Sequence, residues 1–199
     1  QNLIGLHDVL STLPGITFGA GEGGGGYGDS INLRGFSASN DITVDGVRDS
    51  AQYTRSDNFN LEALELVNGA NSAMSGAGSV GGNINLVSKT AHAGNNHDFT
   101  LGAGTDGMAR LTADSNMELS DGATLRLNAM VHQNDVPDRD VERYERWGFA
   151  SSFVMGLGSD TRFSVNVLHQ QDDNIPECSL PYFASYGGLL PGVDRARYL

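Results

Sequence analysis

The sequence predicts a small α+β unit over residues 1–90, followed over residues 91–199 by antiparallel strands typical of a transmembrane β-barrel. Three observations support this fold class. Alternate residues are apolar in a series of segments after residue 97, the turns between these segments alternate in length, and no run approaches the ~20 apolar residues of a membrane helix. Because only about five such strands are present, we expect an incomplete barrel.

The strand expected at 123–133 shows the alternation most clearly. Leu125 and Leu127 fall on one face, whereas Arg126 and Asn128 fall on the other. Side chains in a strand alternate sides with a period of two, so one face can meet lipid and the other a polar interior. Further strands with the same pattern are expected at 97–105, 109–119, 143–157 and 161–171.

The connections between these segments add independent support. Tight turns are expected near 120–122 and 158–160, whereas the connection 134–142 and the segment from 172 onward are longer. The junction 105–108 is an exception, because it is short but falls on the side of the longer connections. Outer-membrane barrels have short periplasmic turns and long external loops. A soluble antiparallel sheet with one wet face produces the same periodicity, so this pattern leaves both interpretations open.

The first 90 residues carry weaker signals. Leucines at helical spacing predict a short helix that ends at Pro14-Gly15, and Asp45-Gly46 predicts a turn. One helical turn is expected at 61–65, running into a strand. The expected strands are 30–34, 42–44, 64–68 and 83–88. This unit contains little apolar bulk and would be marginal if it folded alone.

Composition narrows the class of function. The net charge of −12 argues against non-specific nucleic-acid binding, which needs a positive surface, so no nucleic-acid partner is expected. An anionic ligand would need a local group of arginines. Cys178 is the single cysteine, so the chain has no internal disulfide and no cysteine-rich zinc site. The first residues lack the features of a signal peptide, which indicates either a processed protein or a fragment.

Four strings in the first region occur in a fixed order: INLRGF at 31–36, DITVDGVRD at 41–49, FNLEALELVNG at 59–69 and GAGSVGGNINLVSK at 76–89. Together they closely resemble the plug domain of TonB-dependent outer-membrane receptors, especially ferric-siderophore receptors of the catecholate type. Residues 172–176 and 191–195 resemble the third external loop of that family. One departure is Asn68-Gly69-Ala70, where the family usually has Lys-Gly-Pro.

The resemblance implies a receptor of the bacterial outer membrane, without enzymatic activity and without a cofactor, that takes up a ferric siderophore. Residues 1–90 would be the plug, and residues 91–199 the first strands of the barrel and a long external loop. The implied partners are the siderophore, outer-membrane lipid and the energy-transducing protein TonB. The TonB-contacting segment and most of the barrel are expected to be absent from this chain.

The chemistry of such a ligand limits which residues are candidates for binding it. A ferric catecholate is a large anion with aromatic rings, and arginine offers charge, a hydrogen-bonding fork and a stacking face. We therefore expect Arg48 and Arg55 to supply charge, and Tyr27 and Tyr53 to pack against the rings. Gln52 is a further candidate on the same loops. The alternative for Arg48 is an ion pair with a neighbouring aspartate of its turn.

Other charged residues are expected to join plug and barrel. A plug packed against a polar wall needs paired charges, because an unpaired buried charge is costly. The plug residues proposed for this role are Arg34, Glu62 and Glu65, and the wall residues are Arg110, Arg126 and Arg162.

Several other signals carry less weight. Two glycine patterns of the dinucleotide type, at 19–24 and 102–107, do not lie between a strand and a long helix. The histidines show no metal-ligand spacing, and no metal site is expected. The acidic connection with Asp135, Asp138, Asp140 and Glu142 could bind a divalent cation, but a solvated loop is the simpler interpretation.

A second hypothesis from another class is a soluble or secreted β-rich ligand-binding or adhesin-like protein. The two hypotheses differ in one structural expectation. A membrane barrel leaves Trp147, Phe149, Phe153 and Leu157 on an exposed apolar band, whereas a soluble protein buries them under another layer.

Overall fold

The computed structural model describes residues 9–18, 31–37, 42–48, 57–69 and 81–175, together with 182–183, 185, 187–189, 191–194 and 196–197. These residues form two compact units. The described part of the first unit ends at Thr90, and the second unit begins at Ala91. No helix within the described ranges is long and apolar enough to cross a membrane.

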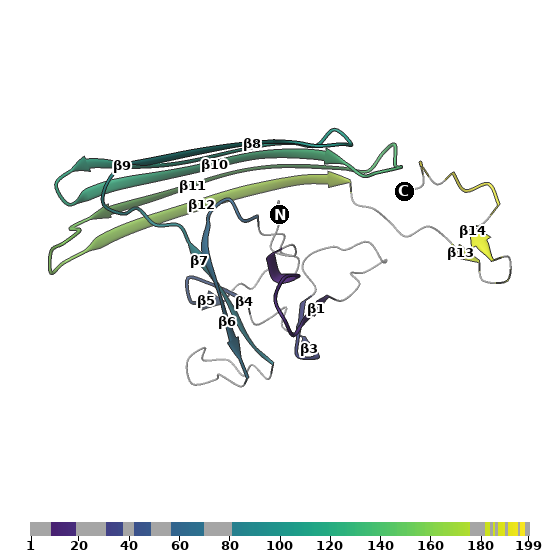
Figure 1. Cartoon of the computed structure of the whole chain (residues 1–199), viewed down its shortest axis with the longest axis horizontal. Coiled ribbons are helices and arrows are strands. Elements are labelled where there is room, and N and C mark those ends of the chain that lie inside the picture. Colours follow the sequence, from purple (N-terminus) through teal and green to yellow (C-terminus); the bar gives the residue numbers. More distant parts are fainter. Residues whose placement is uncertain are drawn as a thin grey trace. The chain divides into compact units, whose positions relative to one another are not determined.

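The first unit contains two small sheets (Figure 1). The first has the order β1-β2-β3 and is antiparallel, and the second has the order β5-β4-β7-β6, with β4 and β7 parallel. The strands are β1 (Ile16–Phe18), β2 (Ile31–Leu33), β3 (Phe36–Ser37), β4 (Ile42–Val44), β5 (Val47–Arg48), β6 (Leu61–Asn68) and β7 (Gly82–Ser88).

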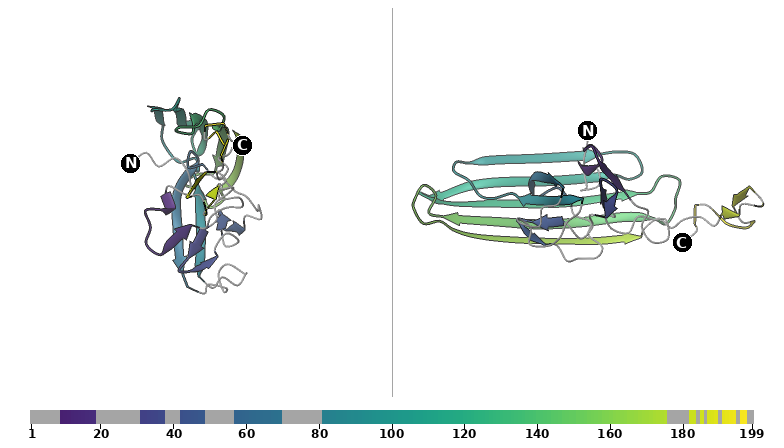
Figure 2. Two further views of the ribbon diagram at one scale, coloured as in Figure 1. Left: turned by 90° about the vertical axis from the view of Figure 1, so that its right-hand side faces the viewer. Right: turned by 90° about the horizontal axis from the view of Figure 1, so that it is seen from below.

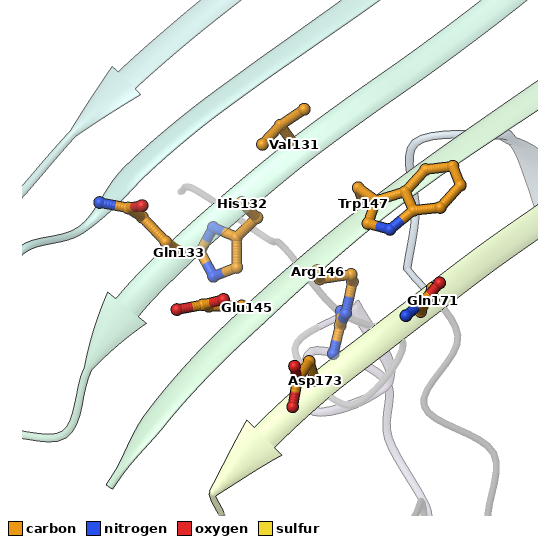
Figure 3. A pocket seen from close by; sticks show the side chains of 8 residues that line it. All are labelled: Val131, His132, Gln133, Glu145, Arg146, Trp147, Gln171 and Asp173. Atoms are coloured by element: carbon orange, nitrogen blue, oxygen red, sulfur yellow. The ribbon is translucent and has the colours of Figure 1, made fainter. Parts of the chain in front are cut away.

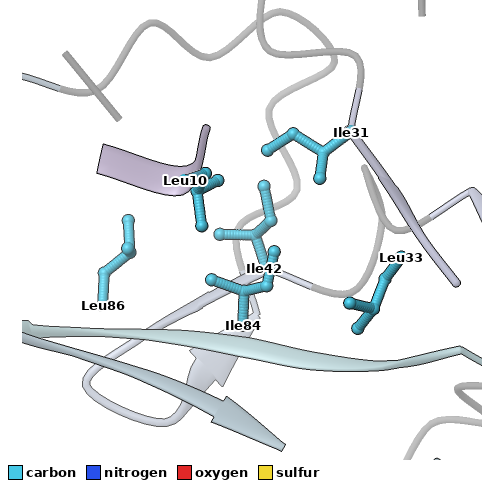
Figure 4. Packing of buried hydrophobic residues seen from close by; sticks show 6 residues of the cluster. All are labelled: Leu10, Ile31, Leu33, Ile42, Ile84 and Leu86. Carbon is cyan, nitrogen blue, oxygen red and sulfur yellow. The ribbon is translucent and has the colours of Figure 1, made fainter. Parts of the chain in front are cut away.

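A single apolar cluster holds the first unit together. Figure 4 shows its six buried side chains converging from the segment before β1 and from strands β2, β4 and β7. Leu10, Ile31, Leu33, Ile42, Ile84 and Leu86 make up this cluster, and each is at most 6% exposed. Because the strands are only two to eight residues long, burial of these side chains contributes much of the stability of the unit.

The predicted turn at Asp45-Gly46 is confirmed. Both residues have positive φ angles, 52° and 80°, as a tight hairpin with right-handed twist requires. Asn85 and Ser88 on the neighbouring strand hold this turn. The Asn85 side-chain oxygen accepts hydrogen bonds from the Gly46 N–H at 2.9 Å and the Thr43 hydroxyl at 2.8 Å, and the Ser88 N–H donates to the Asp45 carboxylate at 2.8 Å. This turn positions β5, and with it Arg48.

The expected helical turn at 61–65 is wrong. These residues belong to β6, which pairs antiparallel with β7 and has an irregular register between Leu61 and Ala63. Pairing with a strand some twenty residues away overrides the weak local helical pattern. Among the described residues, only Val9 and Leu10 are α-helical. The α part of the predicted α+β fold is therefore tested only at these two residues and otherwise stays a prediction.

The second unit is built on one antiparallel sheet in the order β12-β11-β10-β9-β8 (Figures 1 and 2). Each strand pairs with its neighbour in sequence, and the sheet does not close within the described residues. The strands are β8 (Asn96–Ala103), β9 (Ala109–Ser120), β10 (Ala123–Asp135), β11 (Arg143–Met155) and β12 (Phe163–Ile175). They agree with the five predicted strands to within a few residues. A two-stranded hairpin of β13 (Tyr182–Phe183) and β14 (Gly188–Leu189) follows.

The connections at the two ends of the sheet do not differ in length as expected, because residues 156–162, where a tight turn was predicted, form a connection as long as residues 136–142. At one end, β9 and β10 are joined by a turn at Asp121-Gly122, and β11 and β12 by residues 156–162. At the other end lie the turn 104–108, the connection 136–142 and the segment after β12. The Asp135 N–H donates to the Asp106 carbonyl at 2.8 Å, so the connections at this second end are tied to one another. We call this second end the loop end.

Candidate functional site

The five-stranded sheet has two different faces. The outer face carries exposed large apolar side chains from all five strands, of which Leu101 is 81% exposed and Trp147 46% exposed. The other large members are Phe99, Leu111, Leu119, Val131, Phe149, Met155, Phe163, Val165 and Val167. Of the residues chosen to separate a membrane barrel from a soluble sheet, Trp147 and Phe149 are exposed as expected, whereas Phe153 and Leu157 are half-buried.

The opposite, inner face is mainly polar, and its centre is buried; its buried apolar side chains are Met130, Ala150 and Val154. Along β10 the residues alternate between buried and more exposed from Ala123 to Gln133, as the period-two pattern predicts. The buried polar side chains of this face are Arg110, Asn116, Thr124, Arg126, Asn128, His132 and Ser152. Buried polar groups need hydrogen-bond partners, so this face is organised by specific pairs.

One of these pairs joins Arg126 on β10 to Asp114 on β9 and is more buried than the pair of Arg146 and Asp172. The guanidinium donates from Nε to Oδ1 at 2.9 Å and from Nη2 to Oδ2 at 2.8 Å, which is the two-pronged geometry that arginine and carboxylate favour. The two side chains are 9% and 15% exposed. With its nitrogen facing Asp114, the Asn128 amide donates to both carboxylate oxygens at 3.0 and 3.2 Å. The centre of the inner face is therefore a compact charged cluster.

A transverse row of ionisable side chains lies nearer the loop end. Strand register places Arg110, His132, Arg146 and Asp172 opposite one another on β9 to β12. Arg146 forms an ion pair with Asp172, which also accepts a hydrogen bond from the Gln170 amide at 2.8 Å. Sequence reasoning did not select His132, Arg146 or Asp172, although their shared face follows from strand periodicity.

The predicted plug and wall contacts fall in different units. Arg110 and Arg126 are buried on the inner face, whereas Arg162 is exposed just before β12. In the first unit, Arg34, Glu62 and Glu65 are exposed, and the Glu65 carboxylate accepts a hydrogen bond from Asn85 at 2.8 Å. Pairing across the two units therefore remains a prediction.

Of the expected ligand contacts, Arg48 lies within the described residues. It is the last residue of β5 and is exposed. Tyr27, Gln52, Tyr53 and Arg55 lie outside the described residues, as does Cys178.

The acidic connection 136–142 differs from the solvated loop that its composition suggests. Glu142 is buried, and its carboxylate pairs with Arg139, whose Nε donates at 2.6 Å. The Asp140 N–H donates to the Ala196 carbonyl at 2.8 Å, and Arg197 pairs with the Asp140 carboxylate at 3.2 Å. The solvated interpretation is thus wrong for Glu142, because an arginine three residues away compensates its charge. No group of three potential metal ligands occurs in the part of the chain that the structure describes.

The environment of Glu142 shifts its ionisation. Burial raises the pKa of the carboxyl group, but the hydrogen bond from Arg139, the backbone N–H groups of Glu142 and Val141 and the charge of Arg139 together outweigh it. The net result is a pKa below the ordinary value of 4.5. A carboxyl group with a lowered folded-state pKa binds fewer protons in the folded state than in the unfolded state.

We therefore expect Glu142 to stabilise the connection above pH 4.5 and to lose this contribution as the pH falls through its lowered pKa. Hydrogen exchange of the 136–142 amides between pH 7 and pH 3 measures the effect, after correction for the intrinsic pH dependence of exchange. A Glu142→Gln variant is expected to be less protected at neutral pH and to show a flatter pH profile. Equal profiles in the two proteins would contradict the assignment.

A shallow groove of about 290 Å³ lies on the sheet near the loop end (Figure 3). Its outer-face residues come from two neighbouring rows. Val131, Trp147 and Gln171 form one row, and Gln133, Glu145 and Asp173 form the other. The Trp147 ring lies 5.0 Å from the ring of His169. The outer face therefore changes from apolar to charged within one row of side chains.

Comparison with known proteins identifies the family. Residues 1–83 match the family described as the TonB-dependent Receptor Plug Domain. The chain is 39% identical over 188 residues to the probable TonB-dependent siderophore receptor PiuA of Acinetobacter baumannii. The alignment covers 94% of this chain and 25% of PiuA. It is 34% identical over 198 residues to the catecholate siderophore receptor Fiu of Escherichia coli K12. This alignment covers 98% of this chain and 26% of Fiu.

Residues 1–83 of this chain belong to the TonB-dependent receptor plug-domain family. The structural similarity includes both units. The crystal structure of PiuA superposes with a TM-score of 0.85 at 37% identity, and the superposition covers 98% of this chain and 28% of the PiuA chain. The chain spans about a quarter of the length of the curated relatives that it matches. The similarity to TonB-dependent receptors supports the predicted location in the bacterial outer membrane and the expectation that the chain is not an enzyme.

Proposed function

We propose that this TonB-dependent receptor takes up ferric siderophores of the catecholate type across the outer membrane. In this proposal residues 1–90 are the plug, residues 91–199 contribute the first strands of the wall and an external loop, and TonB supplies the energy. The relatives that support this ligand class are the siderophore receptor PiuA and the catecholate siderophore receptor Fiu.

The observation that carries the proposal is the two-faced sheet. Its apolar outer face extends from the row of Ala123, Met155 and Phe163 to the row of Val131, Trp147 and Gln171. This is eight steps along β10, or about 27 Å at ~3.4 Å per residue. With strands tilted by about 40°, the band is roughly 21 Å tall, close to the ~25 Å apolar band of outer-membrane barrels. In a soluble adhesin-like protein, an exposed apolar surface of this size would promote aggregation.

The groove in Figure 3 supports a position for the membrane boundary. Trp147 lies in the last apolar row, and Glu145 and Asp173 lie in the next row toward the loop end. Aromatic side chains are enriched where hydrocarbon meets headgroups, because the ring is apolar and its N–H is polar. In the proposed orientation the lipid boundary passes between these rows, and the loop end faces the cell exterior.

The ligand role rests on local positive charge in an acidic chain. Arg48 is held at the end of β5 by the rigid Asp45-Gly46 turn, and its side chain is exposed. We propose that Arg48 and Arg55 bind the anionic iron complex, with Tyr27, Gln52 and Tyr53 contributing packing and hydrogen bonds. The inner face of the wall, with Arg110 and Arg126, would receive the charged plug residues.

Arg48→Ala is expected to weaken binding of a ferric catecholate about tenfold, because a charge-assisted contact of about 1.4 kcal/mol is lost. Titration of the purified full-length receptor with the ferric complex of 2,3-dihydroxybenzoate, followed by tryptophan fluorescence, measures the change. Arg143→Ala is the matched control, since Arg143 is exposed on the outer face of β11. Equal weakening by both variants would count against a ligand role for Arg48, and absence of binding by the unmodified receptor would overturn the proposed ligand class.

A further inference from the structure

The linker between the two units is fixed by side chains of the sheet. Residues 89–95 join the end of β7 to the start of β8. A solvated linker of this length would hydrogen-bond mainly with water. Here, side chains on β9 and β11 bind the linker backbone at several successive residues, and Ala91 is 1% exposed.

Asn116 on β9 provides the centre of this attachment. Its side-chain oxygen accepts a hydrogen bond from the His92 N–H at 3.1 Å, and its amide nitrogen donates to the carbonyls of His92 at 2.8 Å and Gly94 at 2.6 Å. Asn116 is itself 1% exposed. Both amide protons and one oxygen lone pair are used, so this side chain binds the linker as a neighbouring strand would.

Further contacts continue on both sides of Asn116. The Ala91 N–H donates to the Ser152 hydroxyl on β11 at 3.0 Å. The Gly94 N–H donates to the Glu118 carboxylate at 3.2 Å, and the Glu118 N–H donates to the Asn95 side chain at 2.8 Å. Gly94 has a φ of 85°, a conformation that glycine adopts without strain.

The two main attachment points lie in one transverse row of the inner face. Strand register places Asn116, Arg126 and Ser152 opposite one another on β9, β10 and β11. The linker therefore crosses from β11 toward β8, three strand spacings or about 14 Å. The five residue-to-residue steps from Ala91 to Asn96 reach about 17 Å when fully extended. This segment is therefore close to its fully extended length.

We propose that Asn116 and Ser152 are positioning residues that anchor the linker, so that force applied to the first unit is borne by β9 and β11 before it reaches β8. This inference rests on the proposed function, in which TonB pulls on the plug. Without the anchor, the first unit would be tethered only at Asn96 and would gain up to about 17 Å of reach. The anchor thus sets how far the plug can be displaced while it remains attached to the wall.

Force spectroscopy on the full-length receptor in a membrane, pulled from its amino terminus, tests the proposal directly. After the first unit has extended, the unmodified protein is expected to show a separate rupture of about 17 Å. This step is expected to disappear in Asn116→Ala and to weaken in Ser152→Ala. Hydrogen exchange at the Ala91, His92 and Gly94 amides should rise at least about tenfold in Asn116→Ala.

Asn128→Ala is the matched control, because Asn128 is an equally buried amide on the same face that faces Asp114. Ser152→Thr keeps the hydroxyl group and should restore the step. If Asn116→Ala does not fold, the two Ser152 variants decide the question. An undiminished rupture step, or unchanged exchange, in both Asn116→Ala and Ser152→Ala would overturn the anchor. Neither readout uses a ligand, so failure of the receptor to bind the ferric complex would overturn the proposed function alone.

Discussion

Leu127→Arg is expected to lower the free energy of unfolding of the membrane-embedded receptor by about 2–4 kcal/mol. Leu127 lies on the outer face, opposite Ser115 and Ser151, midway between the row of Ala123 and the row of Val131. In the proposed orientation this is the middle of the hydrocarbon layer. An arginine there must be desolvated or must deform the bilayer to reach water.

Urea unfolding of the receptor in lipid vesicles measures this effect. Gln133→Arg is the control, since Gln133 is on the same face of the same strand but lies in the charged row at the loop end, with Glu145 and Asp173. Near the interface an arginine costs only about 0–1 kcal/mol. Similar small losses at both positions would mean that the apolar face does not contact lipid.

Arg126→Ala is expected to destabilise the protein by about 3–5 kcal/mol, because removal of one member of a buried ion pair leaves the other charge uncompensated. The carboxylate left behind is that of Asp114, which is 15% exposed in the structure. The Asn128 amide also faces this carboxylate, but a neutral donor cannot replace the charge. Denaturant unfolding of the full-length receptor and the single variant gives the difference.

A double variant separates the cost of the unpaired charge from the value of the pair itself. Arg126→Met combined with Asp114→Leu removes both charges and is expected to recover more than half of the lost stability. If the double variant is as unstable as the sum of the single variants, Arg126 and Asp114 do not act as a pair.

Much of the second unit could be predicted because its signals are local. Strand periodicity assigned Leu125 and Arg126 to opposite faces, and the structure places them so. Gly122 and the Asp45-Gly46 pair marked turns, since both glycines take positive φ angles that other residues adopt with strain. These properties depend only on neighbouring residues.

Other features depend on contacts that no short stretch of sequence contains. Residues 61–65 form a strand because β7 lies beside them, not because of their own pattern. Glu142 is buried although its loop is acidic, because Arg139 folds back onto it. The backbone of the linker is fixed by Asn116, which lies some twenty residues later in the sequence.

The sequence by itself determined the five strands, the two faces of the sheet and the family, because alternation and short motifs are carried by adjacent residues. Only the tertiary structure decided which polar side chains find one another: Arg126 with Asp114, Glu142 with Arg139, and Asn116 with the linker backbone. Hydrogen bonds and ion pairs require matched distances and directions, and these follow from strand register and chain path in three dimensions.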